Sequence, residues 1–114
     1  PIDIIGMNCG TGPDQMTENV KYLCENSPFP VSVLPNAGMP EVKDGQQFYT
    51  ETAEDFSRKV EHFAKDFGAN VVGGCCGTSF EHLRQTVEKM QNISPKIRDA
   101  KFTPSASSIY SSQP

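Results

Sequence analysis

The chain has 114 residues, a formal net charge of −4, 36% hydrophobic residues and 21% charged residues. It has no basic run or basic-aromatic stripe, which argues against a nucleic-acid partner, and no apolar stretch approaches the ~20 residues needed to span a membrane. The length fits one small domain or a piece of a larger one. Because Pro1 opens the chain without a methionine or a signal-peptide pattern, we expect a piece.

The first predicted unit is a short strand followed by a helix. An apolar run over residues 2–5 predicts the strand, and the sequence Gly-Met-Asn-Cys-Gly at 6–10 predicts a turn after it. A helix is expected from Pro13, with Gly12 as its N-cap, because proline is tolerated in the first turn of a helix. Apolar side chains then recur at helical spacing, at Met16, Val20, Leu23 and Cys24.

The second predicted unit has a strand over residues 31–34, and the sequence Pro-Asn-Ala-Gly-Met-Pro at 35–40 predicts the turn that ends it. A longer polar loop leads to Thr52, which has the spacing of a capping box with Asp55 in place of glutamate. Gly68 is predicted to end the helix that follows. The apolar stripe of this helix, which we expect to face the core, consists of Phe56, Val60, Phe63 and Phe67.

The third predicted unit has a strand over residues 70–72 and a turn, Gly-Gly-Cys-Cys-Gly-Thr, at 73–78. Thr78 and Glu81 have capping-box spacing and predict the start of a third helix. Residues 95–114 are rich in serine and proline and have no helical period, so we predict an interdomain linker there. The apolar stripe of the third helix consists of Leu83, Val87 and Met90.

Alternating strands and helices predict an α/β fold with a parallel sheet and right-handed crossovers. The three units fill residues 1–94, and an open sheet of three strands with helices on one face would leave much apolar surface in water. A closed barrel of eight units needs ~250 residues. We therefore expect residues 1–94 to be the C-terminal three β/α units of a (β/α)8 TIM barrel. The alternative is a fragment of a doubly wound sheet.

Three cysteines follow predicted strands. Reactive groups of α/β folds gather at the carboxyl ends of the strands, so Cys9, Cys75 and Cys76 are expected to converge there, together with Asn36 from the second turn. A disulfide between the adjacent Cys75 and Cys76 would be strained, although a longer link stays open. The lack of a secretion signal favours a reducing cytosol, where clustered cysteines are more often metal ligands or catalytic groups. Cys24, on an apolar helix face, is predicted to be buried in the core.

The cysteine spacing favours a catalytic zinc site over a structural one. Structural sites usually have C-x-x-C pairs and four protein ligands, whereas catalytic sites have three protein ligands and an open position. This chain has no C-x-x-C and no obvious fourth ligand, His82 being a less favoured candidate. Three thiolates make a soft centre that suits alkyl transfer to a substrate thiol better than hydrolysis. We expect the backbone freedom of Gly73, Gly74 and Gly77 to let two adjacent cysteine sulfurs reach one metal.

At these residues the sequence resembles the zinc-dependent homocysteine S-methyltransferases. The matching motifs are Gly-Met-Asn-Cys at 6–9, Pro-Asn-Ala-Gly-Met-Pro at 35–40 and Gly-Gly-Cys-Cys-Gly-Thr at 73–78, in the order of the family and close to its spacing. The likeness covers about residues 1–94, which correspond to the last third of the family's barrel.

The resemblance implies a reaction and a set of site residues. Cys9, Cys75 and Cys76 would bind zinc, and zinc would bind the thiolate of homocysteine, which takes up a methyl group to give methionine. Asn8 and Asn36 would belong to the substrate pocket, and Asn36 would complete the metal's shell when substrate is absent. No residue is singled out for acid–base catalysis.

The methyl donor divides this family, whose members use methylcobalamin, betaine or S-methylmethionine. The segment 104–111 resembles the linker that leads to a folate-binding domain in the cobalamin-dependent members. We therefore expect methylcobalamin on a separate domain, folate and corrinoid domains in the same full-length chain, and a cytoplasmic location. One alternative is a betaine or S-methylmethionine enzyme without corrinoid; the other, of a different class, is a non-catalytic zinc-stabilised domain. Three units of eight are expected to have little activity alone.

Overall fold

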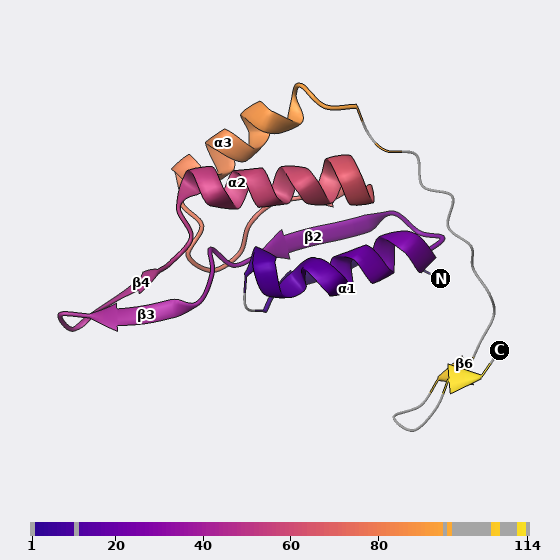
Figure 1. Cartoon of the computed structure of the whole chain (residues 1–114), viewed down its shortest axis with the longest axis horizontal. Coiled ribbons are helices and arrows are strands. Elements are labelled where there is room, and N and C mark those ends of the chain that lie inside the picture. Colours follow the sequence, from indigo (N-terminus) through magenta and orange to yellow (C-terminus); the bar gives the residue numbers. More distant parts are fainter. Residues whose placement is uncertain (1, 11, 95, 97–105, 108–111, 114) are drawn as a thin grey trace.

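The computed structural model describes residues 2–10, 12–94, 96, 106–107 and 112–113. In chain order (Figure 1), its elements are β1 (Ile5–Cys9), α1 (Pro13–Asn26), β2 (Val31–Pro35), β3 (Pro40–Lys43), β4 (Gln46–Tyr49), α2 (Ala53–His62), the π-helical turn η1 (Phe63–Phe67), β5 (Val71–Val72), α3 (Phe80–Met90), β6 (Ala106–Ser107) and β7 (Ser112–Gln113). Within this described part, no helix is long and apolar enough to cross a membrane.

Strands β1, β2 and β5 form a three-stranded parallel sheet with β2 in the middle. Cys9 at the end of β1 is paired with Pro35 at the end of β2, and Val72 at the end of β5 is paired with Val33. The predicted α/β class with a parallel sheet is confirmed. Because parallel strands end at the same edge, the residues that follow all three strands are brought together there.

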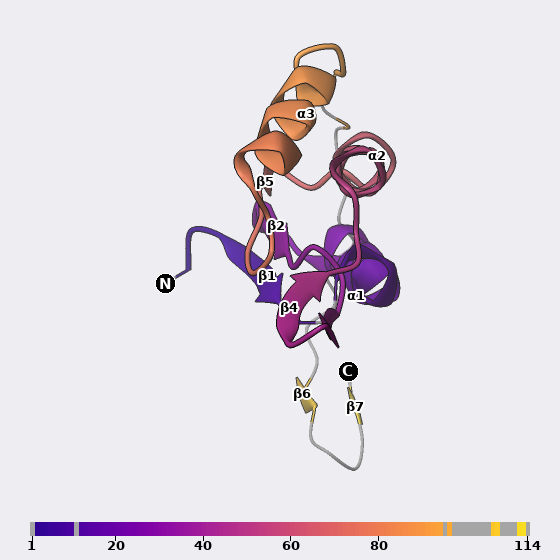
Figure 2. The same cartoon turned by 90° about the vertical axis from the view of Figure 1, so that its left-hand side faces the viewer.

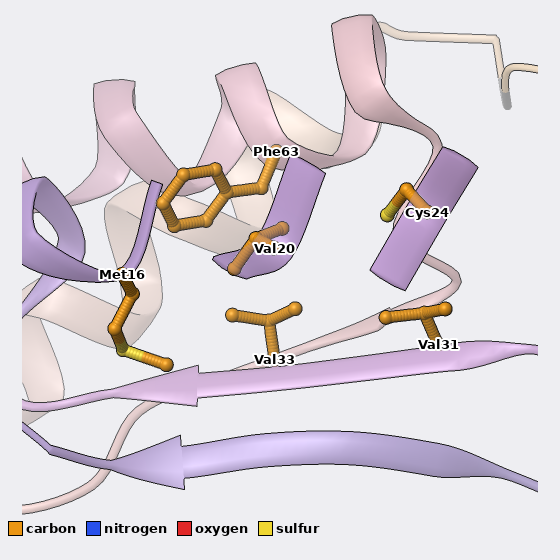
Figure 3. Packing of buried hydrophobic residues seen from close by; sticks show 6 residues of the cluster. All are labelled: Met16, Val20, Cys24, Val31, Val33 and Phe63. Atoms are coloured by element: carbon orange, nitrogen blue, oxygen red, sulfur yellow. The ribbon is translucent and has the colours of Figure 1, made fainter. Parts of the chain in front are cut away.

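Helices α1 and α2 lie on the same side of the sheet and cover one of its faces (Figure 2). In β2 the residues that point to these helices are buried, and those between them are only partly covered. The main core cluster, drawn in Figure 3, consists of Met16, Val20, Cys24, Val31, Val33 and Phe63. Full burial of each valine or phenylalanine contributes about 1.5–3 kcal/mol, so this layer fixes the sheet against the helices.

The predicted core residues of the first two helices are confirmed. Cys24 is 3% exposed, Phe56 is 0% exposed and Phe63 is 1% exposed. Phe67 is partly buried against the main cluster. The cysteine of α1 is therefore a core residue and is separate from the other three.

The predicted apolar stripe of α3 is, by contrast, largely exposed. Helix α3 packs against α2. Of its predicted stripe, Met90 is half-buried. The other two members, together with the neighbouring Phe80, are exposed: 79% for Phe80, 42% for Leu83 and 55% for Val87. These three residues recur on one face of the helix at i, i+3 and i+7. The described residues therefore leave one face of α3 uncovered.

The first strand lies further along the chain than the sequence predicts. The expected strand over residues 2–5 and turn over 6–10 are replaced by β1 at Ile5–Cys9. A Cβ at Gly6 would lie 2.5 Å from the carbonyl oxygen of Ser32, so only glycine fits between the two strands at that point. The glycine that suggested a turn is a close-packing position inside the strand.

A hairpin occupies part of the segment that the sequence predicts to be a polar loop. Strands β3 and β4 pair antiparallel, and the residues between them, Asp44 and Gly45, have positive φ angles of 53° and 79°. Asp-Gly with positive φ at both positions is the signature of a type I′ turn. The two strands have only four residues each and no regular alternation of apolar and polar side chains, so hydrophobic alternation does not reveal them. The hairpin projects past the carboxyl end of β2 (Figure 1).

The ends of the first two helices agree with prediction. Gly12 is the N-cap of α1, and the Thr52 hydroxyl accepts a hydrogen bond from the Asp55 backbone N–H at 3.2 Å. Gly68 adopts the left-handed conformation, with φ 91°, and ends the helical segment after η1.

The predicted capping box at the start of α3 is wrong by one residue. Ser79, not Thr78, is the N-cap, and His82 rather than Glu81 completes the box by accepting from the Ser79 backbone N–H. The Thr78 hydroxyl donates instead to the carbonyl of Cys75 at 2.6 Å. The side chain that the sequence assigned to the helix therefore serves the turn that carries the cysteines.

Most of the predicted linker, residues 95–114, lies outside the described residues. Within it, β6 and β7 pair antiparallel over two residues each. Its role as an interdomain linker stays a prediction.

Candidate metal centre

Three thiols from two distant parts of the sequence meet at the carboxyl edge of the sheet. The sulfur of Cys9 lies 2.9 Å from that of Cys75 and 3.7 Å from that of Cys76, and the Cys75 and Cys76 sulfurs are 4.0 Å apart. Cys9 ends β1, and the other two follow β5, so β2 lies between the strands that supply them. The predicted convergence of these cysteines is what the geometry shows.

Two of the three sulfur separations, 3.7 Å and 4.0 Å, match those around one tetrahedral metal ion, whereas the Cys9 and Cys75 sulfurs, 2.9 Å apart, would have to move apart to share it. At a zinc–sulfur distance of about 2.3 Å, tetrahedral geometry places two thiolate sulfurs about 3.8 Å apart. The Cys9 and Cys75 sulfurs are not bridged, because their separation of 2.9 Å is well beyond the ~2.0 Å of a disulfide. Among the described residues, only Cys9, Cys75 and Cys76 form a group of three or more potential ligands with all donor atoms within 4.8 Å. The donor set is all thiolate, which suits zinc.

Left-handed backbone occurs in both cysteine segments, at Cys9 and Gly10 in one and at Gly77 in the other. Cys9 has φ 61°, an uncommon value for a residue with a side chain, and Gly10 after it has φ 70°. On the other side, Gly77 has φ 79° within a turn closed by the Thr78 N–H, which donates to the Cys75 carbonyl at 3.2 Å. The adjacent cysteines therefore lie on a turn and not on a strand, where they would point to opposite faces.

Asn36 sits between the two cysteine segments. It is 7% exposed, its Nδ2 donates to the Gly10 carbonyl at 2.8 Å, and its Oδ1 accepts from the Cys76 backbone N–H at 3.2 Å. Backbone hydrogen bonds flank it, from Cys75 N–H to the Pro35 carbonyl and from Ala37 N–H to the Cys76 carbonyl, both 2.9 Å long. The turn after β2 thus contacts both cysteine segments.

Asn8 occupies the other face of the sheet. It is exposed, and it alternates with the half-buried Met7 and Cys9 along β1. It borders an open pocket of about 370 Å³ whose lining includes Leu34, Gly74 and Cys75. Of the predicted site residues, Asn8 is therefore the one next to open space beside the cysteines, and Asn36 is the buried one.

Hydrogen bonds among the thiols shift the pKa values of Cys9 and Cys75 in opposite directions. Hydrogen bonding of the Cys9 thiol to the sulfur of Cys75, and then to that of Cys76, raises the pKa of Cys9 to about 11. The same Cys9–Cys75 hydrogen bond lowers the pKa of Cys75. A cation bound at this place would favour the thiolate form of its cysteine ligands.

His82 is directed away from the cysteines. Its Nε2 lies 2.8 Å from the backbone carbonyl of Glu51, its Nδ1 lies 2.8 Å from the Ser79 hydroxyl, and its ring packs edge-on against Phe56. Nδ1 is engaged at the N-cap of α3 itself, and Nε2 ties the start of α3 to the segment between β4 and α2. This agrees with the low weight that the sequence gives to His82 as a ligand.

Sequence reasoning missed Tyr49, which belongs to the unpredicted hairpin. The Tyr49 ring covers the backbone of Gly77, and a Cβ at that glycine would overlap the ring. The Asp-Gly pair at 44–45 is the signal from which this hairpin could have been found. The tyrosine supports the turn that carries Cys75 and Cys76.

Comparison with known proteins agrees with this picture. Residues 1–90 match the homocysteine S-methyltransferase family. The chain is 37% identical over 113 residues to methionine synthase of Mycobacterium tuberculosis and 34% identical over 118 residues to methionine synthase of Mycobacterium leprae. Each alignment covers 99% of this chain and 10% of the relative, so the chain spans about a tenth of the length of these proteins.

Proposed function

This chain belongs to the homocysteine S-methyltransferase family, and on that premise we propose that it supplies the metal-binding part of an enzyme that methylates homocysteine to methionine. The observation that carries the proposal is the approach of three sulfurs to within 4.8 Å of one another at the carboxyl edge of a parallel sheet. In α/β enzymes this edge is where active sites lie.

Cys9, Cys75 and Cys76 are the residues we propose to hold zinc. When bound, zinc supplies a Lewis acid that lowers the pKa of an entering substrate thiol. The three cysteines would contribute three negative charges, which keep the bound substrate sulfur electron-rich, and they leave one position of a tetrahedral shell for it. In the proposed reaction the thiol would give up its proton to water and its sulfur would form a bond to the donor's methyl carbon. The bond between that carbon and the donor would break, and its electron pair would stay with the donor.

Asn8 and Asn36 are proposed to belong to the homocysteine pocket. Asn8 is exposed beside the pocket that Cys75 borders, which supports a direct contact with substrate. Asn36 is buried and hydrogen-bonded to backbone on both sides, which supports a role in shaping the site.

For the fold, we propose that these three units belong to a closed (β/α)8 barrel. Three observations support closure. Strands β1 and β5 each pair on one side only within the described sheet. The sheet face opposite the helices borders an open pocket. The face of α3 formed by Phe80, Leu83 and Val87 is exposed. Further β/α units on both edges would cover each of these surfaces.

For the methyl donor, we propose methylcobalamin carried by another domain of the full-length protein, with a folate domain in the same chain and a cytoplasmic location. The support is the relatives' name, methionine synthase, and their length, of which this chain covers 10%. The thiol state of Cys9, Cys75 and Cys76 suits a reducing compartment.

The test uses the full-length protein. We expect one zinc per chain, methyl transfer to homocysteine from methylcobalamin and not from betaine or S-methylmethionine, and loss of zinc in Cys75→Ser. Cys24→Ala is the matched control, because Cys24 is a core residue that lies apart from the cluster. A Cys75→Ser protein with full zinc and full activity would refute the proposed role of Cys75 as a zinc ligand.

Cobalt substitution distinguishes the proposed enzyme from a non-catalytic zinc-stabilised domain. A change in the cobalt absorption spectrum on adding homocysteine is expected for the enzyme. No change would support a zinc-stabilised domain without catalytic function. Activity with betaine or S-methylmethionine alone would replace the proposed donor.

A further inference from the structure

We infer that His82 is a positioning residue, which acts through the backbone carbonyl of Glu51 to hold the start of α3 in place. Because α3 begins shortly after the turn that carries Cys75 and Cys76, the same contact sets where that turn lies. The inference rests on the proposed zinc site and deepens it, since it names a residue outside the set of metal ligands that keeps two of them in place.

Glu51 is joined to all three β/α units at the carboxyl edge of the sheet. Its backbone N–H donates to the Ala37 carbonyl, in the turn after β2, at 3.0 Å. Its carboxylate lies 2.6 Å from the Nζ of Lys59 on α2, and the same ammonium group lies 2.8 Å from the carboxylate of Asp14 in the first turn of α1. Its carbonyl oxygen lies 2.8 Å from the Nε2 of His82. Glu51 is therefore a fixed point to which the start of α3 is tied.

Close packing connects this fixed point to the Cys9 segment. Gly12, the N-cap of α1, lies three residues after Cys9 (12 − 9). A Cβ at Gly12 would be 2.7 Å from the Cα of Gly38, and a Cβ at Gly38 would be 3.2 Å from the backbone nitrogen of Glu51. The start of α1, the turn after β2 and the segment before α2 are thus in backbone contact. His82 completes this line of contacts on the side of the other two cysteines.

The turn that carries the cysteines is bound to the start of α3. The hydroxyl and the backbone N–H of Thr78 both donate to the Cys75 carbonyl, at 2.6 Å and 3.2 Å. A Cβ at Gly74 would overlap the Thr78 side chain. Ser79, the next residue, is the N-cap of α3. A displacement of the helix start would therefore carry the backbone of Cys75 with it.

The position of the hydrogen on the His82 ring follows from its partners. A carbonyl oxygen can only accept, so Nε2 carries the hydrogen and donates to Glu51. Nδ1 is then the acceptor for the hydroxyl of Ser79, at 2.8 Å, and for its backbone N–H, at 3.3 Å. The ring also packs edge-on against the fully buried Phe56, which fixes its orientation. One side of the ring thus caps the helix, and the other side links the helix to Glu51.

Two substitutions separate these two functions of the ring. Asparagine places its Oδ1 where Nδ1 lies and can still accept from Ser79, but it is too short to reach Glu51. Glutamine is long enough to bring an amide donor to the Glu51 carbonyl. A role confined to capping α3 predicts that His82→Asn behaves like the parent. Positioning through Glu51 predicts that His82→Asn is impaired and that His82→Gln is restored.

The measurement is the zinc affinity of the full-length protein, by competition with a chromophoric chelator. Affinity falls with the fraction of zinc-free molecules in which the cysteine turn is in position. Because one hydrogen bond changes an equilibrium by about 2-fold to 10-fold, we expect a loss of about 3-fold or more for His82→Asn and recovery to within about 2-fold for His82→Gln. His62→Asn is the matched control, because His62 is exposed and pairs with Asp66 in the same helical segment. Parental affinity in His82→Asn, or equal losses in the two His82 variants, overturns the inference.

A double-mutant cycle tests whether the effect passes through Glu51. Lys59→Met removes the ammonium group that ties Glu51 to Asp14 and keeps a side chain of similar length. If Glu51 is already loosened, the loss of its bond to His82 matters less. The combined variant should then lose less affinity than the product of the two single losses. A combined loss equal to that product overturns the inference. A parent protein that binds no zinc refutes the proposed function and this inference together; a parent that binds zinc through Cys75, with His82→Asn unaffected, refutes the inference alone.

Discussion

The ring of Tyr49 lies against the backbone of Gly77, in contact so close that residue 77 has no room for a side chain. The hairpin and the cysteine turn, 28 residues apart (77 − 49), therefore hold each other in place. This contact leads to a prediction about the metal centre.

Gly77→Ala should weaken zinc binding and loosen the turn. The new Cβ would overlap Tyr49, and alanine is strained at φ 79°. The strain costs about 1–2 kcal/mol and the overlap about 1–3 kcal/mol more. Gly45→Ala is the control, because Gly45 has the same φ of 79° and nothing lies within 4 Å of its would-be Cβ. Zinc affinity and hydrogen exchange of residues 75–80 in the full-length protein measure the difference, and equal effects of the two changes would refute it.

Removal of zinc should expose three thiols and leave the fourth protected. Cys76 is exposed and Cys9 and Cys75 are half-buried, so in the loaded enzyme their protection from alkylation must come from the metal, whereas Cys24 is protected by burial. We expect an alkylating reagent to label Cys9, Cys75 and Cys76 only after chelation, as read by peptide mass spectrometry. Homocysteine binding should disappear in the chelated protein and return with zinc. Labelling of these three thiols in fully zinc-loaded enzyme would contradict the assignment.

Val33→Ala should destabilise the domain by about 2 kcal/mol, because it removes two methyl groups from a fully buried site between the sheet and the helices. Val42→Ala makes the same chemical change in the hairpin, where Val42 is 75% exposed, and should have almost no effect. The thermal midpoint of unfolding of each variant reports the difference. Similar midpoints for the two variants would mean that the core is not where the structure puts it.

Acid should loosen α3 through Glu81. The Arg84 guanidinium, with help from Gln85, holds the pKa of the Glu81 carboxyl at about 2. A pKa lowered by folding means that the contribution to stability is complete above the ordinary value near 4.5 and is lost as pH falls toward 2. We expect a small effect, because water and salt screen this exposed pair. The protection of the α3 amides from hydrogen exchange, corrected for the intrinsic exchange rate at each pH, should fall between pH 5 and pH 3 less in Glu81→Gln than in the parent, with Glu41→Gln as the control.

The meeting of Cys9 with Cys75 and Cys76 could be predicted from the sequence because one rule, that parallel strands end together, decides it. The rule tolerates an error in the strand itself: β1 runs from Ile5 to Cys9 and not over residues 2–5, yet the cysteine is at its carboxyl end in both versions. The close contact that requires glycine at position 6 could not be predicted, because it is made with Ser32, in a strand 26 residues away (32 − 6).

The start of α3 shows a second limit. Thr78 and Ser79 are neighbours, and each is followed three residues later by a side chain that can complete a capping box. The choice depends on the Cys75 carbonyl, which takes the Thr78 hydroxyl and leaves Ser79 for the helix. The local spacing of residues does not reveal which of Thr78 and Ser79 caps the helix.

The arrangement in which β2 separates the strands that carry the cysteines has a consequence for chain entropy. A metal shared by Cys9 and Cys75 ties together residues 66 positions apart, and a covalent link that closes a loop of this length removes about 4 kcal/mol of conformational entropy from the unfolded chain. During synthesis, the ligand set becomes complete only after the third strand of the sheet has left the ribosome. Metal uptake is thus the step that can lock the first and last of these β/α units into one cooperative body.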